Sequence, residues 1–172
     1  MRQLAEKEPG NPDEDFSLAV ERAVRFIEYR PRSTGETRSR LRRWGYAPAT
    51  CERVAAYLVE AGILDDHDFA RLFMDELLRK GLGRYRVRSE LIKKKLDREL
   101  VDEVMERYPL EEELERAKGV AEKRFVRTSE PDATSSRKVT EYLMRRGYSR
   151  QVAAAACRLL TQVDTQTSTE LE

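Results

Sequence analysis

The sequence repeats one short pattern three times: LRRWGY at Leu41–Tyr46, LIKKKL at Leu91–Leu96 and LMRRGY at Leu143–Tyr148. The leucines that open the three stretches stand 50 and 52 residues apart. Each stretch follows a basic segment with helical periodicity and precedes an amphipathic one, and no segment alternates like a strand. We therefore predict an all-α fold with three short helical modules in tandem.

The register of the repeats supports this alignment. Four residues before each leucine stands a residue that can face inward, and a pair four residues apart forms one apolar stripe on a helix. These residues are Thr37, Val87 and Val139.

A glycine closes the second helix of two repeats. Gly45 and Gly147 suit the left-handed cap that turns a chain out of a helix. The middle repeat has Lys95 at this position, so we expect its turn to differ.

The 172 residues carry a net charge of +1, but the charges are segregated along the chain. Residues 22–43 and 79–98 are densely basic, whereas residues 60–76 and 99–115 are mostly acidic. Cys51 and Cys157 lie in apolar helical patterns and are expected to be reduced and structural. The sequence shows neither a signal peptide nor a transmembrane segment, so we expect a cytoplasmic protein that does not bind membranes.

Turn signals and polar runs suggest the domain boundaries. We expect a flexible lead-in at residues 1–16, modules at 17–63, 64–108 and 109–160, and a disordered tail at 161–172. The final Leu171-Glu172 could be a cloning remnant.

Catalytic chemistry has few candidate residues. His67 is the only histidine, and it lies beside Asp65, Asp66 and Asp68. Such a cluster can bind a metal, but aspartates at a helix start are also explained as caps, and we favour that explanation. No cysteine pair has metal-ligand spacing, and no nucleotide-binding glycine loop is present. We predict no enzymatic activity, no metal and no cofactor.

Basic residues cluster instead on the second helix of each module, and some recur at equivalent positions, as in Arg43, Lys93 and Arg145. Recurring cations of this kind favour binding to a polyanion or to an acidic groove, although a charge run is more often a solvated helix face. The candidate contact residues are Arg38, Arg42, Arg43, Arg84, Arg86, Arg88, Lys93, Lys94, Arg145 and Arg146.

From about Glu21 to Leu160 the chain resembles the RecX regulatory proteins. The resemblance rests on LDDHDFA at Leu64–Ala70, GLGRYRVRSEL at Gly81–Leu91, RPRS at Arg30–Ser33 and the repeated LRRWGY and LMRRGY. It implies three tandem three-helix modules, helix-turn-helix-like, in an elongated and curved arrangement. Ser33 would cap the second helix.

The resemblance also implies a function. A RecX-type protein binds the RecA recombinase filament on single-stranded DNA and hinders filament growth, ATP hydrolysis and strand exchange. We expect a monomer, with Arg84, Arg86, Arg88, Lys93 and Lys94 as the main contacts.

Two other functions also fit tandem basic helices. A helix-turn-helix transcriptional regulator would present a recognition helix with residues suited to base edges, yet the chain has a single asparagine, at position 11. A helical-repeat scaffold that binds only protein would leave the basic helices solvated, and DNA binding measured at two salt concentrations separates it from the other two.

Overall fold

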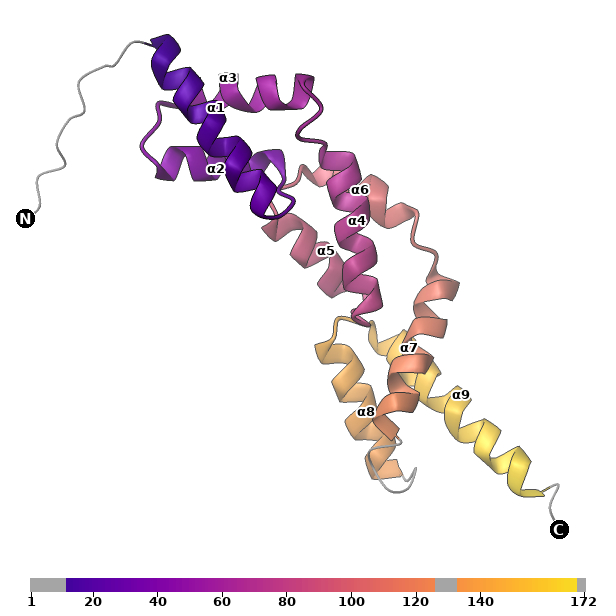
Figure 1. Cartoon of the computed structure of the whole chain (residues 1–172). Coiled ribbons are helices and arrows are strands. Elements are labelled where there is room, and N and C mark those ends of the chain that lie inside the picture. The colour runs from indigo at the N-terminus through magenta and orange to yellow at the C-terminus, as the bar shows by residue number, and fades with distance from the viewer. Residues whose placement is uncertain (1–11, 126–132, 170–172) are drawn as a thin grey trace, which may run out of the picture. The chain divides into compact units, whose positions relative to one another are not determined.

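A computed structural model describes residues 12–125 and 133–169 (Figure 1), and within these residues every regular element is an α-helix. This confirms the all-α fold class. The helices are α1 (Pro12–Tyr29), α2 (Thr34–Arg43), α3 (Pro48–Glu60), α4 (Asp66–Arg79), α5 (Arg84–Lys93), α6 (Arg98–Glu106), α7 (Leu110–Phe125), α8 (Ala133–Arg145) and α9 (Arg150–Thr169).

The chain divides into two compact units, and α4 runs through the division. The first unit contains the described residues up to Ala70 together with the Lys94–Leu96 turn. The second contains Arg71–Lys93 and the described residues from Asp97 onward. The module boundaries expected at residues 63/64 and 108/109 fall between α3 and α4 and between α6 and α7, and they remain predictions.

Each unit has its own hydrophobic core. In the first unit, small residues of α1 let that helix pack closely on α2 and α3, and the buried cluster is Ala19, Ala23, Leu41, Cys51, Val54, Leu58 and Leu64. In the second unit, α7, α8 and α9 enclose Ala117, Ala121, Val139, Leu143, Tyr148, Val152, Ala153, Ala156 and Cys157. Both cysteines are free and buried, as expected.

The predicted inward positions are confirmed. Leu41, Leu91 and Leu143 are fully buried. The residues four positions earlier are at most 1% exposed, and these are Thr37, Val87 and Val139. The leucine and its partner therefore form the buried stripe of each second helix.

The middle turn does not differ in the way we expected. Lys95 has a φ of 59°, so it adopts a left-handed backbone like Gly45 at 90° and Gly147 at 91°. The expectation of a different turn was wrong because a lysine can occupy this conformation at a cost of about 1 kcal/mol, which the surrounding packing must offset.

The chain ends also differ from expectation. We predicted a flexible lead-in through residue 16, yet α1 begins at Pro12. Proline suits the first turn of a helix, and the acidic Asp13, Glu14 and Asp15 complement its positive end. The predicted tail begins at residue 161, whereas α9 continues to Thr169. Residues 1–11 and 170–172 lie outside the described part of the chain.

Candidate functional site

The candidate contact residues lie on α2, α5 and α8 and in the turns that follow α5 and α8, and they fall into two groups by exposure. One group is partly covered by the protein: Arg38, Arg84, Arg88, Lys94 and Arg146. The other group is exposed: Arg42, Arg43, Arg86, Lys93 and Arg145. The contacts of the first group show what their charges do within the fold.

The N-terminus of α2 is fixed by a capping box, which confirms Ser33 as the N-cap. The Ser33 hydroxyl accepts a hydrogen bond from the Glu36 backbone N–H at 3.0 Å, and the Glu36 carboxylate accepts one from the Ser33 N–H at 3.4 Å. Thr37 Oγ1 donates to the Ser33 carbonyl at 3.0 Å. Two amides left unpaired at the helix start are thereby satisfied, and Glu36 is held in place.

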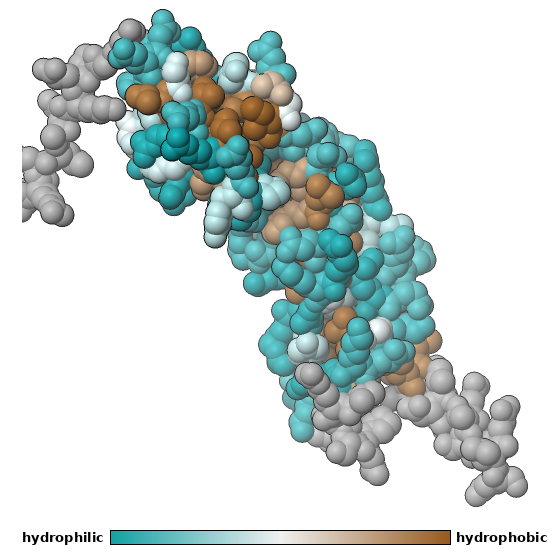
Figure 2. Space-filling model, in the orientation of Figure 1, coloured by the Kyte–Doolittle hydropathy of each residue, from teal (hydrophilic) through white to brown (hydrophobic). Residues whose placement is uncertain are grey.

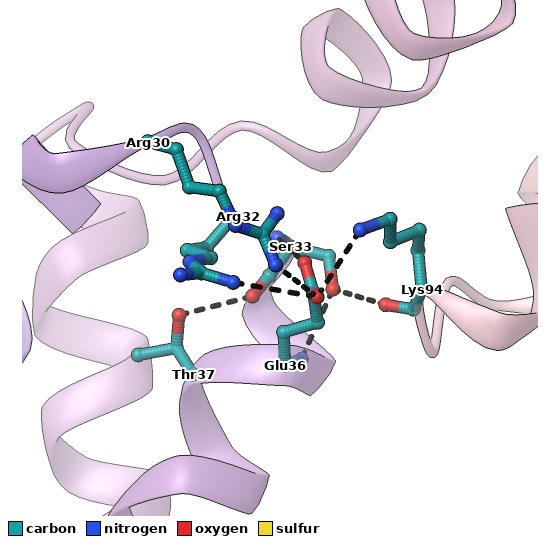
Figure 3. Close-up of polar contacts among 6 residues, drawn as sticks. All are labelled: Arg30, Arg32, Ser33, Glu36, Thr37 and Lys94. Carbon is teal, nitrogen blue, oxygen red and sulfur yellow. Dashed lines mark hydrogen bonds and ion pairs between the residues drawn. The ribbon is translucent and has the colours of Figure 1, made fainter. Parts of the chain in front are cut away.

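Glu36 then gathers three cations, as Figure 3 shows. Its Oε1 lies 3.4 Å from Arg30 Nη2, 3.8 Å from Arg32 Nη1 and 3.4 Å from Lys94 Nζ. The Lys94 side chain is only 19% exposed, and its backbone carbonyl accepts a hydrogen bond from the Ser33 hydroxyl. Lys94, predicted as a main contact, therefore holds the Lys94–Leu96 turn against the start of α2 within the first unit.

Gly35 allows this turn to approach α2 closely. A Cβ at Gly35 would lie 2.7 Å from Lys95 Cβ and still closer to the Lys95 carbonyl oxygen, so no larger residue fits without movement. The Lys95 side chain extends back along α2 and donates to the Ser39 hydroxyl. These contacts explain how the left-handed Lys95 is tolerated.

The second unit repeats this contact at equivalent register, between the start of α5 and the turn after α8. The Gly83 N–H donates to the Arg146 carbonyl at 2.9 Å, and the Tyr85 N–H donates to the Gly147 carbonyl at 3.0 Å. A Cβ at Gly83 would lie 2.5 Å from the Gly147 carbonyl oxygen. Gly83 corresponds to Ser33 in the repeat alignment, and Gly147 corresponds to Lys95.

Arg146 also stabilises the end of α4. Its Nε donates to the Gly81 carbonyl at 2.9 Å, one terminal nitrogen donates to the Lys80 carbonyl, and the other donates to the Tyr142 hydroxyl at 3.0 Å. Carbonyls at a helix C-terminus lack partners within the helix, and a cation satisfies them well. Arg146 thus supports the fold through its guanidinium.

Arg84 has a similar role at the end of α6. Its guanidinium donates to the Met105 carbonyl at 2.9 Å and to the Tyr108 carbonyl at 3.1 Å. Its backbone N–H donates to Glu113 Oε1 at 2.9 Å, and Glu113 is 2% exposed. The burial of Glu113 could not be predicted from the sequence, because Glu113 stands in an acidic run that is typical of a solvated helix face.

The remaining partly covered cations pair with nearby carboxylates. Arg88 binds Asp102, and this hydrogen bond lowers the pKa of the Asp102 carboxyl and raises the pKa of Arg88. Arg38 pairs with Glu52 at 2.8 Å, and the exposed Arg42 pairs with the same carboxylate at 3.0 Å. Pairs exposed to this degree contribute little to stability because water and salt screen them.

Three of the exposed cations occupy one equivalent position. Arg43, Lys93 and Arg145 are the last residues of α2, α5 and α8. Within the described residues, the Arg43 side chain hydrogen-bonds to the Ser39 carbonyl of its own helix at 3.4 Å, and Lys93 pairs with Glu90 of its own helix at 3.0 Å. All three side chains therefore remain available to a partner.

Among residues 12–125 and 133–169, no group of three His, Cys, Asp or Glu side chains could hold a metal. Two of the aspartates beside His67 cap helix starts: Asp65 Oδ1 accepts from the Asp68 N–H at 2.9 Å, and Asp66 Oδ1 accepts from the Thr34 N–H at 2.7 Å. In the same part of the chain, no helix combines the length and the apolar character that crossing a membrane requires.

The visible face of the second unit is mostly hydrophilic, whereas hydrophobic residues gather over the helices of the first (Figure 2).

Fold and surface together define a tandem helical-repeat protein whose second helices each end in an exposed cation. Family models for the first, second and third three-helix domains of RecX match residues 19–58, 65–105 and 111–157. The chain belongs to the RecX family of regulatory proteins.

Relatives and solved structures agree with this assignment. The chain is 31% identical over 135 residues to the regulatory protein RecX of Halorhodospira halophila, which covers 78% of this chain and 83% of that protein. It is 38% identical over 101 residues to the RecX of Serratia proteamaculans and 30% identical over 139 residues to that of Listeria welshimeri, but these matches span only 60% and 52% of those proteins.

The crystal structure of RecX from Lactobacillus salivarius matches with a TM-score of 0.78. The match covers 87% of this chain and 99% of that one at 18% identity, and it supports the fold.

Proposed function

We propose that this chain binds the RecA filament on single-stranded DNA and restrains filament growth, ATP hydrolysis and strand exchange. It acts as a cytoplasmic monomer in this proposal. Membership of the RecX family supports the regulatory role, since the relatives are named regulatory proteins.

The observation that carries the proposal is the exposed cation that ends each second helix. Arg43, Lys93 and Arg145 recur at one register position in three modules, and each is exposed. A partner with a repeating negative surface, such as a nucleoprotein filament, can meet the same charge several times. Each cation near a phosphate also releases a condensed counterion, which makes the attraction dependent on salt.

The test replaces these three cations together, as Arg43→Ala, Lys93→Ala and Arg145→Ala. The ATPase activity of the cognate RecA on single-stranded DNA is then measured while the variant is titrated in, at two salt concentrations. We expect weaker inhibition by the variant, and a larger difference between variant and parent at the lower salt concentration.

A matched control removes three other exposed arginines that end no second helix: Arg25→Ala, Arg53→Ala and Arg107→Ala. The control loses the same total charge, so a general charge effect would weaken it equally. Equal inhibition by parent and test variant at both salt concentrations would show that this surface is not the contact. Loss of inhibition in the control alone would lead to the same conclusion.

A further inference from the structure

A surface pocket of about 670 Å³ lies within the second unit. Its lining residues come from the end of α4 and from α7 and α8 with the turn after α8, and these helices are labelled in Figure 1. Its volume falls in the range of pockets that hold small molecules. The family assignment attaches no role to it, and it does not include the cations that end the second helices.

Charge distinguishes this pocket from an ordinary surface hollow. Five cations line it, Arg79, Lys80, Lys123, Arg124 and Arg146, and Glu122 is the one carboxylate among the described lining residues. Arg79 and Lys123 make no ion pair within the described part of the chain, while Lys80 pairs with Glu76 at 2.5 Å. Cations gathered in a concave site with little compensating charge produce a positive potential that attracts anions.

The protein holds part of this charge in a fixed geometry. The three hydrogen bonds that Arg146 donates to Gly81, Lys80 and Tyr142 use three of the five N–H groups of its guanidinium. The two remaining N–H groups belong to a side chain that is already ordered, so an anion that binds them need not supply the cost of ordering it.

The ring of Tyr142 does not offer a free platform for a base. Its centroid lies 5.1 Å from the guanidinium carbon of Arg124 and 5.5 Å from that of Arg146, so two cations already contact the ring. The pocket therefore provides contacts for phosphate groups and no evident contact for a nucleobase.

We propose that this pocket binds an oligophosphate, such as the tail of a nucleoside triphosphate or a free polyphosphate. A single phosphate of a DNA backbone carries one negative charge. The five cations of the pocket face only Glu122 and the Glu76 that pairs with Lys80, and this excess of positive charge matches a ligand with several negative charges in a small volume. The proposal does not depend on filament binding.

The test uses calorimetric titration of the full chain with sodium tripolyphosphate. Arg79→Ala combined with Lys123→Ala should weaken binding by roughly tenfold, because it removes two charges that make no ion pair within the described part of the chain. Glu122→Gln should strengthen binding by a few fold, because it removes the opposing charge. Both changes lie at exposed positions, so the fold should be retained.

Three further measurements make the outcome decisive. ATP should bind as tightly as tripolyphosphate if the pocket recognises only phosphates. Much tighter binding of ATP would show that the pocket also recognises the base and would contradict this part of the proposal. The control variant Arg25→Ala with Arg107→Ala should bind tripolyphosphate like the parent. An equal loss of affinity in this control would show that the effect comes from the total charge of the protein and would overturn the proposal. A single-stranded oligonucleotide that responds to the pocket variants while tripolyphosphate does not would also overturn the proposal.

Discussion

The change Gly83→Ala tests whether the close contact between the start of α5 and the turn after α8 stabilises the second unit. Gly83 has no positive φ, so alanine suits its backbone and any effect comes from space. The new Cβ would lie 2.5 Å from the Gly147 carbonyl oxygen and closer still to the Gly147 carbonyl carbon and the Tyr148 nitrogen. All three atoms belong to the backbone, which cannot rotate away as a side chain can.

The expected loss of stability follows from the contacts that break when the turn after α8 moves away from the start of α5. Moving the turn away weakens the hydrogen bonds of the Gly83 and Tyr85 amides, at about 1 kcal/mol each. Overpacking adds about 1–3 kcal/mol. We expect Gly83→Ala to lower the free energy of unfolding by about 3–5 kcal/mol, a large fraction of the ~5–15 kcal/mol that stabilises a typical domain.

Urea denaturation followed by circular dichroism measures this loss. Trp44, the only tryptophan, lies in the first unit, so its fluorescence reports whether that unit unfolds separately. Gly119→Ala is the matched control: it lies inside α7 with nothing within 4 Å of a new Cβ, and it should stabilise the helix by about 0.5–1 kcal/mol. An unchanged midpoint for Gly83→Ala, or an equal loss in the control, would refute the reasoning.

Three other predictions concern single residues. Lys95→Gly should raise the free energy of unfolding in urea by about 1 kcal/mol, because glycine adopts the left-handed backbone without strain; a loss of stability would contradict this. Arg84→Ala should destabilise by about 2 kcal/mol in the same assay because it leaves helix-end carbonyls unpaired, whereas the exposed Arg86→Ala should change stability by less than about 0.5 kcal/mol. Burial raises the pKa of Tyr148, so the stability that depends on its neutral hydroxyl is complete below about pH 10 and is lost as the pH rises above it. Tyr148→Phe should therefore reduce the loss of thermal stability at alkaline pH. A smaller loss should remain because burial also raises the pKa of Tyr108.

The sequence predicted the helices and the buried stripes because both depend on neighbours within one helix. Leu41, Leu91 and Leu143 lie one turn after their inward partners, and a local period is enough to place such residues. The turn at Lys95 could not be predicted in the same way. Its conformation depends on Gly35, which lies 60 positions earlier in the chain and leaves room for the turn.

The same limit applies to the candidate contact residues, which stay a prediction. A sequence shows which residues carry charge but not which distant carbonyl or carboxylate each one meets. Arg84 reaches Tyr108, 24 residues away, and Arg146 reaches Gly81, 65 residues away. Both therefore looked like surface cations in the sequence, although their guanidinium groups bind backbone carbonyls.

The exposed cations at the ends of the second helices could also be explained by helix stability alone. The ends of the other helices do not support this explanation as the whole cause. A cation at a helix C-terminus interacts favourably with the helix dipole, by about 0.3–1 kcal/mol, and this alone could favour Arg43, Lys93 and Arg145. If it were the whole cause, the third helices should also end in cations, yet α3 ends in Glu60 and α6 ends in Glu106. Cations also occupy the last turns of α4 and α7, whereas α1, α3 and α6 have none there. Only the second helices therefore end in a cation in all three modules, which is the pattern expected of a surface that meets a negatively charged partner.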